Sequence, residues 1–274
     1  MKKIIKALVL IVPVILFGCD SKKETALEKN TEYKLTSKEN RTYKILLIDE
    51  IDSISQGQQV TSEPLLKKII GEYTVLSSTK LQTEYEKNEV KADLNYRKKL
   101  IIINGKVLSI DRGIGEDYFI SLNGGSNMFI NPKINMADGY TEFLAGLNKG
   151  DFVSLVCQGN GMLLGSAMAN KCEPLLNYAS KKVDTYLKGF SLSENLVKTS
   201  PSELQTSLIS MVASSQLPDN SSCYKETNYY EKKCTQEIQN LKVFKKDKVE
   251  FQKQLELNIT KAGLNLEDVK SALK

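Results

Sequence analysis

The fold is decided by the stretch KLIIINGKVLSI, residues 99 to 110, a long run of aliphatic and β-branched residues interrupted by Asn104-Gly105. Such a run predicts a β-strand. Two shorter runs follow, DYFISL at 117 to 122 and NMFIN at 127 to 131, and the Asn123-Gly124-Gly125 between them is a hairpin signal. The stretch therefore predicts three strands in a row.

A short helix and two more strands complete the pattern. From Gly139 to Leu147 the apolar residues recur at helical spacing, and Lys149-Gly150 then ends the helix. Residues 151 to 158 alternate as a fourth strand, and residues 163 to 172 supply a fifth after the turn signal Gly159-Asn160-Gly161. The order β-β-β-α-β-β is that of an OB-fold, a small five-stranded Greek-key barrel. We predict an α+β chain with an OB-fold barrel at 99–175.

The residues on both sides of the barrel are predicted to be helical. In the N-terminal segment, 43–98, helical patterning begins at Ser62, whereas Tyr43 to Ile51 fits a short strand as well as a helix. In the C-terminal region, 176–274, Ser200-Pro201-Ser202-Glu203 is a capping box and Asn265 caps a last short helix. The stripes that predict packing helices are Leu65, Leu66, Ile69, Ile70 and Tyr73; Leu81, Tyr85, Glu89, Ala92 and Tyr96; and Leu175, Leu176, Ala179, Val183 and Leu187.

The start of the chain has the pattern of a bacterial lipoprotein signal. Three lysines within the first six residues precede an apolar segment at 7 to 17, and ILFGC at 15 to 19 resembles a lipobox. The resemblance implies cleavage between Gly18 and Cys19, a diacylglyceryl thioether on Cys19 and acylation of the new N-terminus. The alternatives are an ordinary secretory signal with an incidental cysteine, or an uncleaved anchor.

The signal also predicts a location. Residues 1–18 are then a removed signal peptide, and residues 19–42, polar and charged, form a lipidated flexible tether that lifts the folded part off the membrane. We expect a lipid-anchored protein of the bacterial cell envelope that faces the periplasm. Asp20 resembles an inner-membrane retention signal of enteric-type bacteria, so the inner membrane is expected if the host sorts lipoproteins as those bacteria do.

Composition excludes several classes of function. The chain has no histidine, which removes Ser/His/Asp triads, Cys/His dyads and imidazole metal sites. Without residues 1–18, which carry three lysines and no acid, the formal net charge falls from +5 to about +2. A nearly neutral chain gives no electrostatic case for nucleic acid as a partner. We predict no cofactor.

Four cysteines remain once Cys19 carries lipid, and an even number in an oxidising compartment indicates disulfides. Cys157, Cys172, Cys223 and Cys234 allow three pairings, of which two local bridges are the most economical. A four-thiolate zinc site is the rival, but it normally shows Cys-x-x-Cys pairs, so we predict no metal. One continuous helix would hold Cys223 and Cys234 about 16 Å apart, so a bridge there predicts a break near Thr227-Asn228.

The chain also resembles a known family. The stretch TEYEKNEVKAD at 83 to 93, followed by Tyr96 and by NGKV at 104 to 107, is similar to the bacterial tRNA_anti-like OB-fold family, as are LNKGDFV at 147 to 153 and the pair Cys157 and Cys172. The similarity covers roughly residues 80 to 175. The family name records a distant likeness to anticodon-binding OB-folds, and its members, often secreted or lipid-anchored, mostly have no assigned activity. The resemblance therefore implies a fold and a Cys157–Cys172 bridge rather than a function.

Strand geometry restrains that bridge, which we nevertheless predict from the resemblance and the oxidising compartment. If the hairpin turns at Gly159 to Gly161, Cys157 faces residue 164 or 165, roughly 23 Å from Cys172 at the rise of a strand. The Cα atoms of a disulfide must lie within about 7 Å of each other. The bond then requires a wide loop at 158 to 165 or strong coiling of the barrel. If it forms, closing a loop of this size contributes about 3 kcal/mol.

The first hypothesis for function is a non-catalytic binding module that recognises a protein, peptide or glycan in the envelope. OB-folds bind ligands across their second and third strands and in the loops that join strands one to two and four to five. Those loops are here Arg112 to Glu116 and Gln158 to Gly165. The candidate ligand surface consists of Arg112, Glu116, Phe119, Phe129 and Gln158.

Two alternatives belong to other classes of protein. One is a protective or inhibitory envelope protein, of the immunity or exclusion type, that acts through the helical region 176–274. The other, less favoured, is a glycan-cleaving enzyme that uses carboxylates among Asp111, Glu116 and Asp117. Carboxylates in loops are usually only solvated, so no catalytic residue is assigned.

Overall fold

The computed structural model describes residues 32–60, 62–113, 118–125, 129–193, 196, 199–225, 232–245 and 248–273. The chain divides into two compact units. The barrel unit consists of Asp52–Gln58 and Ile70–Ala179, and the helical unit consists of the described residues within Met1–Ile51, Gln59–Ile69 and Ser180–Lys274. Along the sequence, the barrel unit is therefore an insertion within the helical unit.

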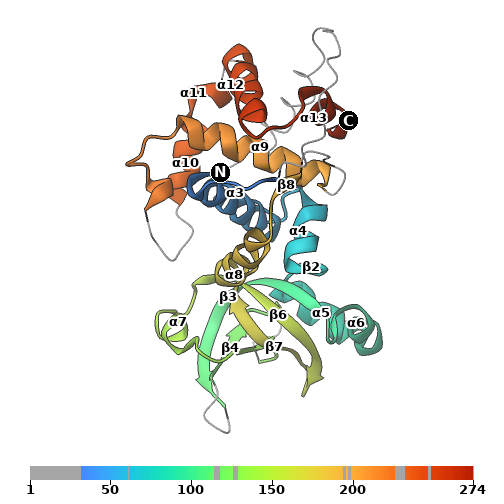
Figure 1. Ribbon diagram of the computed structural model, residues 1–274. Helices are drawn as coiled ribbons and strands as arrows, with labels where there is room; N and C mark the ends of the chain where they lie inside the picture. The colour runs from blue at the N-terminus through green and yellow to red at the C-terminus, as the bar shows by residue number, and fades with distance from the viewer. Residues whose placement is uncertain are drawn as a thin grey trace. The chain divides into compact units, whose positions relative to one another are not determined.

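Five strands of the barrel unit form a closed ring in the order β3–β4–β5–β7–β6, and β6 pairs again with β3. Only β5 and β7 are parallel neighbours in this ring. The elements of the unit, most of them labelled in Figure 1, are β2 (Tyr73–Ser77), α5 (Ser78–Lys87), α6 (Glu89–Tyr96), β3 (Leu100–Arg112), β4 (Tyr118–Leu122), β5 (Lys133–Met136), α7 (Thr141–Ala145), β6 (Phe152–Leu163) and β7 (Ser166–Pro174). The predicted α+β class, the OB-fold barrel and its β-β-β-α-β-β order are confirmed.

Strand β3 closes the barrel because it pairs with two strands in succession. Its first half, from Leu100 to Lys106, pairs with β6, and its second half, from Val107 to Arg112, pairs with β4. The register shifts between Val107 and Ser109, which marks a β-bulge. A bulge bends a strand and increases its twist, so a single strand can serve both sides of the ring. Strand β2 adds to the first half of β3 in parallel.

One apolar core fills the barrel and continues under helices α5 and α6. Its buried members are Leu76, Leu81, Tyr85, Ala92, Tyr96, Ile101, Ile103, Val107, Ile120, Leu122, Ile134, Leu144, Val153, Leu155, Cys157, Ala167, Ala169 and Cys172. The Asn88 side chain accepts a hydrogen bond from the Lys91 amide and caps α6, so the predicted stripe from Leu81 to Tyr96 is carried by two helices. Because this stripe packs into the barrel core, the barrel unit begins well before residue 99.

Two strands differ from the sequence prediction. The third strand of the ring is Lys133–Met136, and the described residues at 129 to 131, where it was predicted, lie in no strand. The Asn131 side chain instead accepts a hydrogen bond from the Gly124 amide at 2.9 Å, which holds this segment as a loop. Tyr73 was predicted to continue a helix, but Gly71, with a φ of 93°, ends that helix and Tyr73 begins β2.

The last hairpin of the barrel turns later than predicted. Strand β6 runs on through Gly159-Asn160-Gly161 to Leu163, and the chain reverses at Leu164-Gly165. Register shifts between Val156 and Met162 then bring Cys157 opposite Cys172, with Cα atoms 4.2 Å apart. The structure contains this disulfide, and the geometric objection to it came from placing the turn at the wrong glycines.

The helices of the helical unit are α3 (Ser37–Ser55), α4 (Glu63–Ile70), α8 (Leu175–Lys188), α9 (Pro201–Gln216), the 3-10 helix η1 (Ser222–Tyr224), α10 (Lys232–Asn240), α11 (Lys242–Lys245), α12 (Lys248–Lys261) and α13 (Leu266–Ala272). Three of them are shared with the barrel unit, to which Asp52–Ser55 of α3, Ile70 of α4 and the part of α8 before Ser180 belong. Two short strands, β1 (Glu32–Tyr33) and β8 (Leu192–Ser193), pair antiparallel. The undecided segment from Tyr43 to Ile51 is helical. The predicted capping box at Ser200 and Glu203 and the cap at Asn265 are both present. Within the described residues, none of the helices combines the length and the apolar character needed to cross a bilayer.

A second disulfide joins Cys223 to Cys234, with Cα atoms 4.7 Å apart. Cys223 lies in η1 and Cys234 in α10, so the two cysteines do not share one continuous helix. The predicted break at Thr227-Asn228 itself lies outside the described residues.

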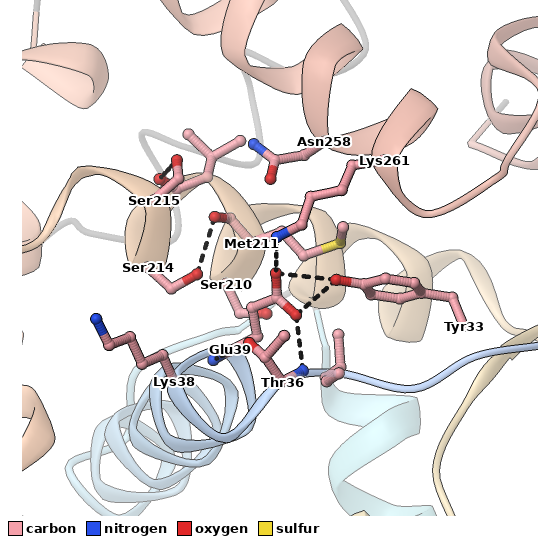
Figure 2. A network of polar contacts seen from close by, with 12 residues as sticks. Tyr33, Thr36, Lys38, Glu39, Ser210, Met211, Ser214, Ser215, Asn258 and Lys261 are labelled. Carbon is pink, nitrogen blue, oxygen red and sulfur yellow. Dashed lines mark hydrogen bonds and ion pairs between the residues drawn. The ribbon is translucent and has the colours of Figure 1, made fainter.

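Glu39 ties the beginning of the described chain to helix α12 (Figure 2). Its carboxylate accepts hydrogen bonds from the Tyr33 hydroxyl at 2.8 and 3.1 Å and from the Thr36 amide at 2.8 Å, and Lys261 Nζ lies 3.4 Å away. Thr36 Oγ1 accepts from the Glu39 amide in return, which completes a capping box at the start of α3. Residues 32 to 42, predicted to belong to a flexible tether, are therefore folded, whereas residues 19 to 31 lie outside the described residues.

Glu50 on α3 is a buried carboxyl group in the helical unit. Only 2% of the residue is exposed, and neither carboxyl oxygen has a hydrogen-bond partner among the described residues. Burial raises the pKa of Glu50 to about 8, and the neighbouring Asp49 adds to the shift. Between about pH 4.5 and pH 8 the folded chain keeps a proton on Glu50 that the unfolded chain has released. The contribution of Glu50 should therefore lower the free energy of unfolding as the pH rises through this range.

We therefore expect Glu50→Gln to flatten the pH dependence of unfolding. A shift of this size lowers the free energy of unfolding of the wild type by on the order of 4 kcal/mol across that pH window. The glutamine variant, which has no carboxyl group at this position, should not show this decrease. Urea unfolding at pH 5 and pH 8 measures the difference. Glu267→Gln, at an exposed carboxylate, is the control and should behave as the wild type does. Parallel curves for wild type and Glu50→Gln would show that Glu50 is ionised throughout.

Candidate ligand-binding face

Strands β3, β4 and β5 turn one row of side chains into the barrel and the other row outward. Ile120 and Ile134 are fully buried in the barrel core and Ile110 packs against it, so the residues that alternate with them lie on the outside. Cross-strand pairing places Asp111 beside Phe119 and Phe119 beside Asn135, and in the next row Ser109 beside Ser121 and Ser121 beside Lys133. We call this set the β3–β5 face: Ser109, Asp111, Phe119, Ser121, Lys133 and Asn135.

Hydrogen bonds join the polar members of the β3–β5 face into one chain. Lys133 Nζ donates to Ser121 Oγ at 2.7 Å. The hydroxyls of Ser121 and Ser109 donate to Asp111 Oδ2 at 3.4 and 2.5 Å. The Lys133 ammonium group on β5 and the Asp111 carboxylate on β3 are thus connected through the Ser121 hydroxyl on β4, the strand between them. This arrangement fixes their positions before any ligand arrives.

An aromatic ring lies beside this polar chain. Lys133 Nζ is 4.8 Å from the centroid of the Phe119 ring, a cation–π distance. Phe119 and Lys133 are each only partly buried, so both remain accessible from outside. The face therefore offers one apolar ring surface, one cation, one carboxylate and the hydroxyl of Ser109, whereas Ser121, only 3% exposed, lies beneath them and connects Lys133 to Asp111. This combination is suited to holding a ligand that has apolar and polar sides.

The arrangement offers less for catalysis. Acid–base cleavage of a glycan needs two carboxyl groups facing one bond. Asp111 is the carboxylate of the β3–β5 face, and Glu116 and Asp117, its predicted companions, lie outside the described residues. Asp111 is also held by two serine hydroxyls rather than directed at an open position. Among the residues that the structure describes, no cluster of three or more Cys, Asp or Glu side chains could hold a metal ion.

The structure brings together only part of the ligand surface predicted from the sequence. Phe119 lies on the β3–β5 face. Arg112 follows Asp111 and pairs with Tyr118, so alternation turns it to the other side of β3. Glu116 lies outside the described residues, and Phe129, although 86% exposed, lies in a loop.

Gln158 is far from this face. It pairs with Leu100 at the opposite end of β3 and with Asn170 on β7, and its side chain donates to the Lys98 carbonyl at 3.4 Å. The sequence prediction missed Ser121 and Lys133, and it named Asp111 only as a possible catalytic carboxylate. The signal that identifies them is the alternation of polar residues around Ile110, Ile120 and Ile134, which requires the correct third strand.

Comparison with known proteins places the barrel in a family. The family model tRNA_anti-like matches residues 1–173. No curated protein shows a significant match to the sequence. A crystal structure of a protein from Klebsiella pneumoniae subsp. pneumoniae, provisionally named a nucleic acid-binding lipoprotein, is similar over 43% of this chain and 98% of that chain, with 15% sequence identity and a TM-score of 0.32. The family match extends over more than half of the sequence and includes the closed five-stranded barrel, and the chain therefore belongs to the tRNA_anti-like family.

Proposed function

We propose that this protein is a non-catalytic binding module of the bacterial cell envelope that holds its ligand on the β3–β5 face. The observation that carries the proposal is the row formed by Phe119, Lys133, Ser121 and Asp111, connected by hydrogen bonds and a cation–π contact. Phe119, Ser121 and Lys133 come from the second and third strands of the ring, across which OB-folds bind their ligands, and Asp111 comes from the first. Their positions are set by strand pairing rather than by a loop, which keeps the ordering cost of binding small.

The charges of the face favour an envelope ligand over a nucleic acid. Proteins that bind nucleic acids without base specificity concentrate lysine and arginine along the path of the phosphates. Here Asp111 lies on β3 at one end of the row, and its carboxylate would repel a phosphate chain. The small net charge of the chain without residues 1–18 points the same way. A protein, peptide or glycan of the envelope fits the face better.

The location belongs to the same proposal and rests on the sequence of the first twenty residues. Gly18 and Cys19 would be the cleavage site, Cys19 would carry the lipid, and Asp20 would retain the protein at the inner membrane in a host that sorts lipoproteins in the enteric manner. Two or three acyl chains on one residue hold a protein firmly at a membrane, whereas one chain holds it only marginally. The module would then face the periplasm.

Phe119→Ala tests the ligand surface. The full-length protein, solubilised in detergent, is passed over two columns, one carrying purified cell-wall glycan and one carrying envelope proteins. We expect the wild type to be retained on one of them and Phe119→Ala to bind at least tenfold more weakly, because truncating a central aromatic residue of a binding site costs about 2 kcal/mol.

Leu94→Ala is the matched control for this experiment. Leu94 is an apolar residue of the same unit, 72% exposed on α6 rather than on the β3–β5 face, and its truncation should leave retention unchanged. Thermal unfolding of each variant confirms that the barrel is intact. Equal retention of Phe119→Ala and the wild type, or no retention on either column, would contradict the proposal.

A further inference from the structure

The β3–β5 face continues beyond the bulge of β3 onto strand β6. Lys106 on β3 pairs directly with Phe152 on β6. Their neighbours Val107 and Val153 are buried in the barrel core, so Lys106 and Phe152 point outward. Lys106 is exposed, and Phe152 is 65% exposed, which is unusual for a phenylalanine in a strand. A second lysine and a second phenyl ring therefore lie side by side on the outside of the barrel.

The bulge is what places this second pair on the same surface as the first. In a regular strand, Lys106 and Ser109 would point to opposite sides because they are an odd number of residues apart. The register shift between Val107 and Ser109 inserts one extra residue, so that Lys106, Ser109 and Asp111 all point outward. The Asn123 amide donates to the Lys106 carbonyl at 2.9 Å, so β4 still flanks β3 at this point. The outward surface is thus continuous along β3 from Asp111 to Lys106.

The two phenyl rings lie at opposite ends of this surface. Phe119 is paired with Asp111 and Phe152 with Lys106. Asp111 and Lys106 are five residues apart on β3, which corresponds to about 16 Å at the rise of a strand. No single side chain or sugar ring contacts both phenyl groups across such a distance. The Ser109 hydroxyl lies between these ends, and the Asp111 carboxylate lies beside Phe119.

We infer that the ligand of this face is a linear oligosaccharide that lies along β3 from Phe119 to Phe152, an inference that rests on the proposed function. Sugar rings have apolar faces that stack on phenyl groups and hydroxyl edges that exchange hydrogen bonds with serine, aspartate and lysine. OB-folds bind oligosaccharides across their second and third strands, and Phe119 and Lys133 lie on those two strands here, β4 and β5. A phosphate chain would meet the Asp111 carboxylate at the Phe119 end. A peptide adding as an extra strand needs a free sheet edge, and β4 is paired on both sides.

The length of the ligand provides the test. The N-acetylglucosamine disaccharide and hexasaccharide are titrated into the full-length protein in detergent by calorimetry, with a twelve-nucleotide thymidine oligomer in a separate arm. The disaccharide is expected at the Phe119 end, where hydrogen-bonding groups are concentrated. The hexasaccharide should bind at least tenfold more tightly than the disaccharide. Phe152→Ala should weaken hexasaccharide binding fivefold or more and leave disaccharide binding unchanged, whereas Phe119→Ala should weaken both.

Each contrary outcome has a distinct meaning. If Phe119→Ala weakens binding and Phe152→Ala does not, or if the hexasaccharide binds no more tightly than the disaccharide, the extended site is wrong and the proposed function stands. If neither sugar binds, the oligosaccharide assignment is overturned. If the thymidine oligomer binds more tightly than the hexasaccharide and both alanine variants weaken it, the face binds nucleic acid instead. Phe152→Tyr, which keeps the ring, should retain hexasaccharide binding, and Leu94→Ala should match the wild type.

Discussion

Replacing Gly159 with alanine is expected to unfold the barrel unit at temperatures where the wild type is folded. A Cβ atom at position 159 would lie 2.2 Å from the carbonyl oxygen and 2.8 Å from the carbonyl carbon of Tyr96. Neither backbone can move away easily, because the Lys98 amide donates to the Gly159 carbonyl at 2.8 Å and the Gly159 amide donates to the Lys99 carbonyl at 3.0 Å. The end of α6 and the middle of β6 are locked together at a spacing that only glycine allows.

The expected cost is about 3 kcal/mol or more, at the upper end of the range for overpacking, because the clash is with backbone rather than with a flexible side chain. This is a large part of the stability of a typical domain. The melting temperature should fall by about 10 °C or more. Gly146→Ala is the control in the same unit, because its Cβ would meet only ordinary contacts at 3.5 and 3.6 Å. Similar melting temperatures for Gly159→Ala and Gly146→Ala would contradict the packing of α6 on β6.

Replacing Cys19 with alanine is expected to abolish lipidation completely. If Cys19 is the lipidated residue, the wild type grown with radiolabelled palmitate should incorporate the label and migrate as a chain without residues 1–18. Cys19→Ala should carry no label and keep its leader, because the thioether that precedes cleavage cannot form. The measurement is autoradiography of the immunoprecipitated protein beside an immunoblot of the same lanes.

Two companion variants make this result specific. Cys223→Ser removes a disulfide cysteine and should leave the label unchanged. Asp20→Ser should also keep the label, but in an enteric host it should move the protein from the inner to the outer membrane fraction. A wild type without label would show that residues 1 to 18 are an ordinary secretory signal or an uncleaved anchor. An unchanged membrane fraction for Asp20→Ser would dismiss the sorting role alone.

The elements with strong local patterns could be predicted from the sequence. Residues 99 to 110 and 117 to 122 correspond to β3 and β4, and the segment around Phe143 corresponds to α7. The third strand could not be predicted, because its residues 133 to 136 include a single fully buried residue, Ile134, whereas the loop before it is more apolar. Strand β5 is defined by closure of the barrel, through parallel pairing with β7 far along the sequence. Local composition carries no signal for such a contact.

The glycines at 159 and 161 explain the other error in the barrel. In sequence, Gly159-Asn160-Gly161 has the composition of a turn. In the structure, both glycines lie within β6, where Gly159 makes room for the Tyr96 carbonyl and Gly161, with a φ of 80°, lies beside Asp93. Glycine in a strand often marks a close approach of another backbone, and that approach is tertiary information. The predicted position of the turn, and with it the geometry expected for Cys157 and Cys172, followed from this ambiguity.

The candidate site could likewise be predicted only in part, because most of its residues are brought together by strand pairing. Phe119 was predicted because β4 was placed correctly, but Lys133 depends on the register between β4 and β5, and Phe152 depends on the pairing of β6 with β3. Arg112 and Gln158 were chosen because OB-folds in general use the loops that contain them. Strand pairing in this chain separates these two residues from the β3–β5 face.

The division into units also changes how the protein should be dissected. A boundary at residue 175 would separate residues 32–51 and 59–69 from the rest of the helical unit, to which they belong. The contacts of Glu39 with Lys261, and of Lys68 with Glu203, cross that boundary. The alternative function, a protective role of residues 176–274, should therefore be tested in the full chain with substitutions and not with truncated halves.

The most direct test of the central claim is a crystal structure of the protein grown with the N-acetylglucosamine hexasaccharide. Our account predicts a sugar ring stacked on Phe119, with hydroxyl groups hydrogen-bonded to Asp111, Ser109 and Lys133, and a chain that continues along β3 toward Phe152. A hexasaccharide bound elsewhere on the barrel unit, or bound to the helical unit, would contradict the assignment of the β3–β5 face as the ligand surface.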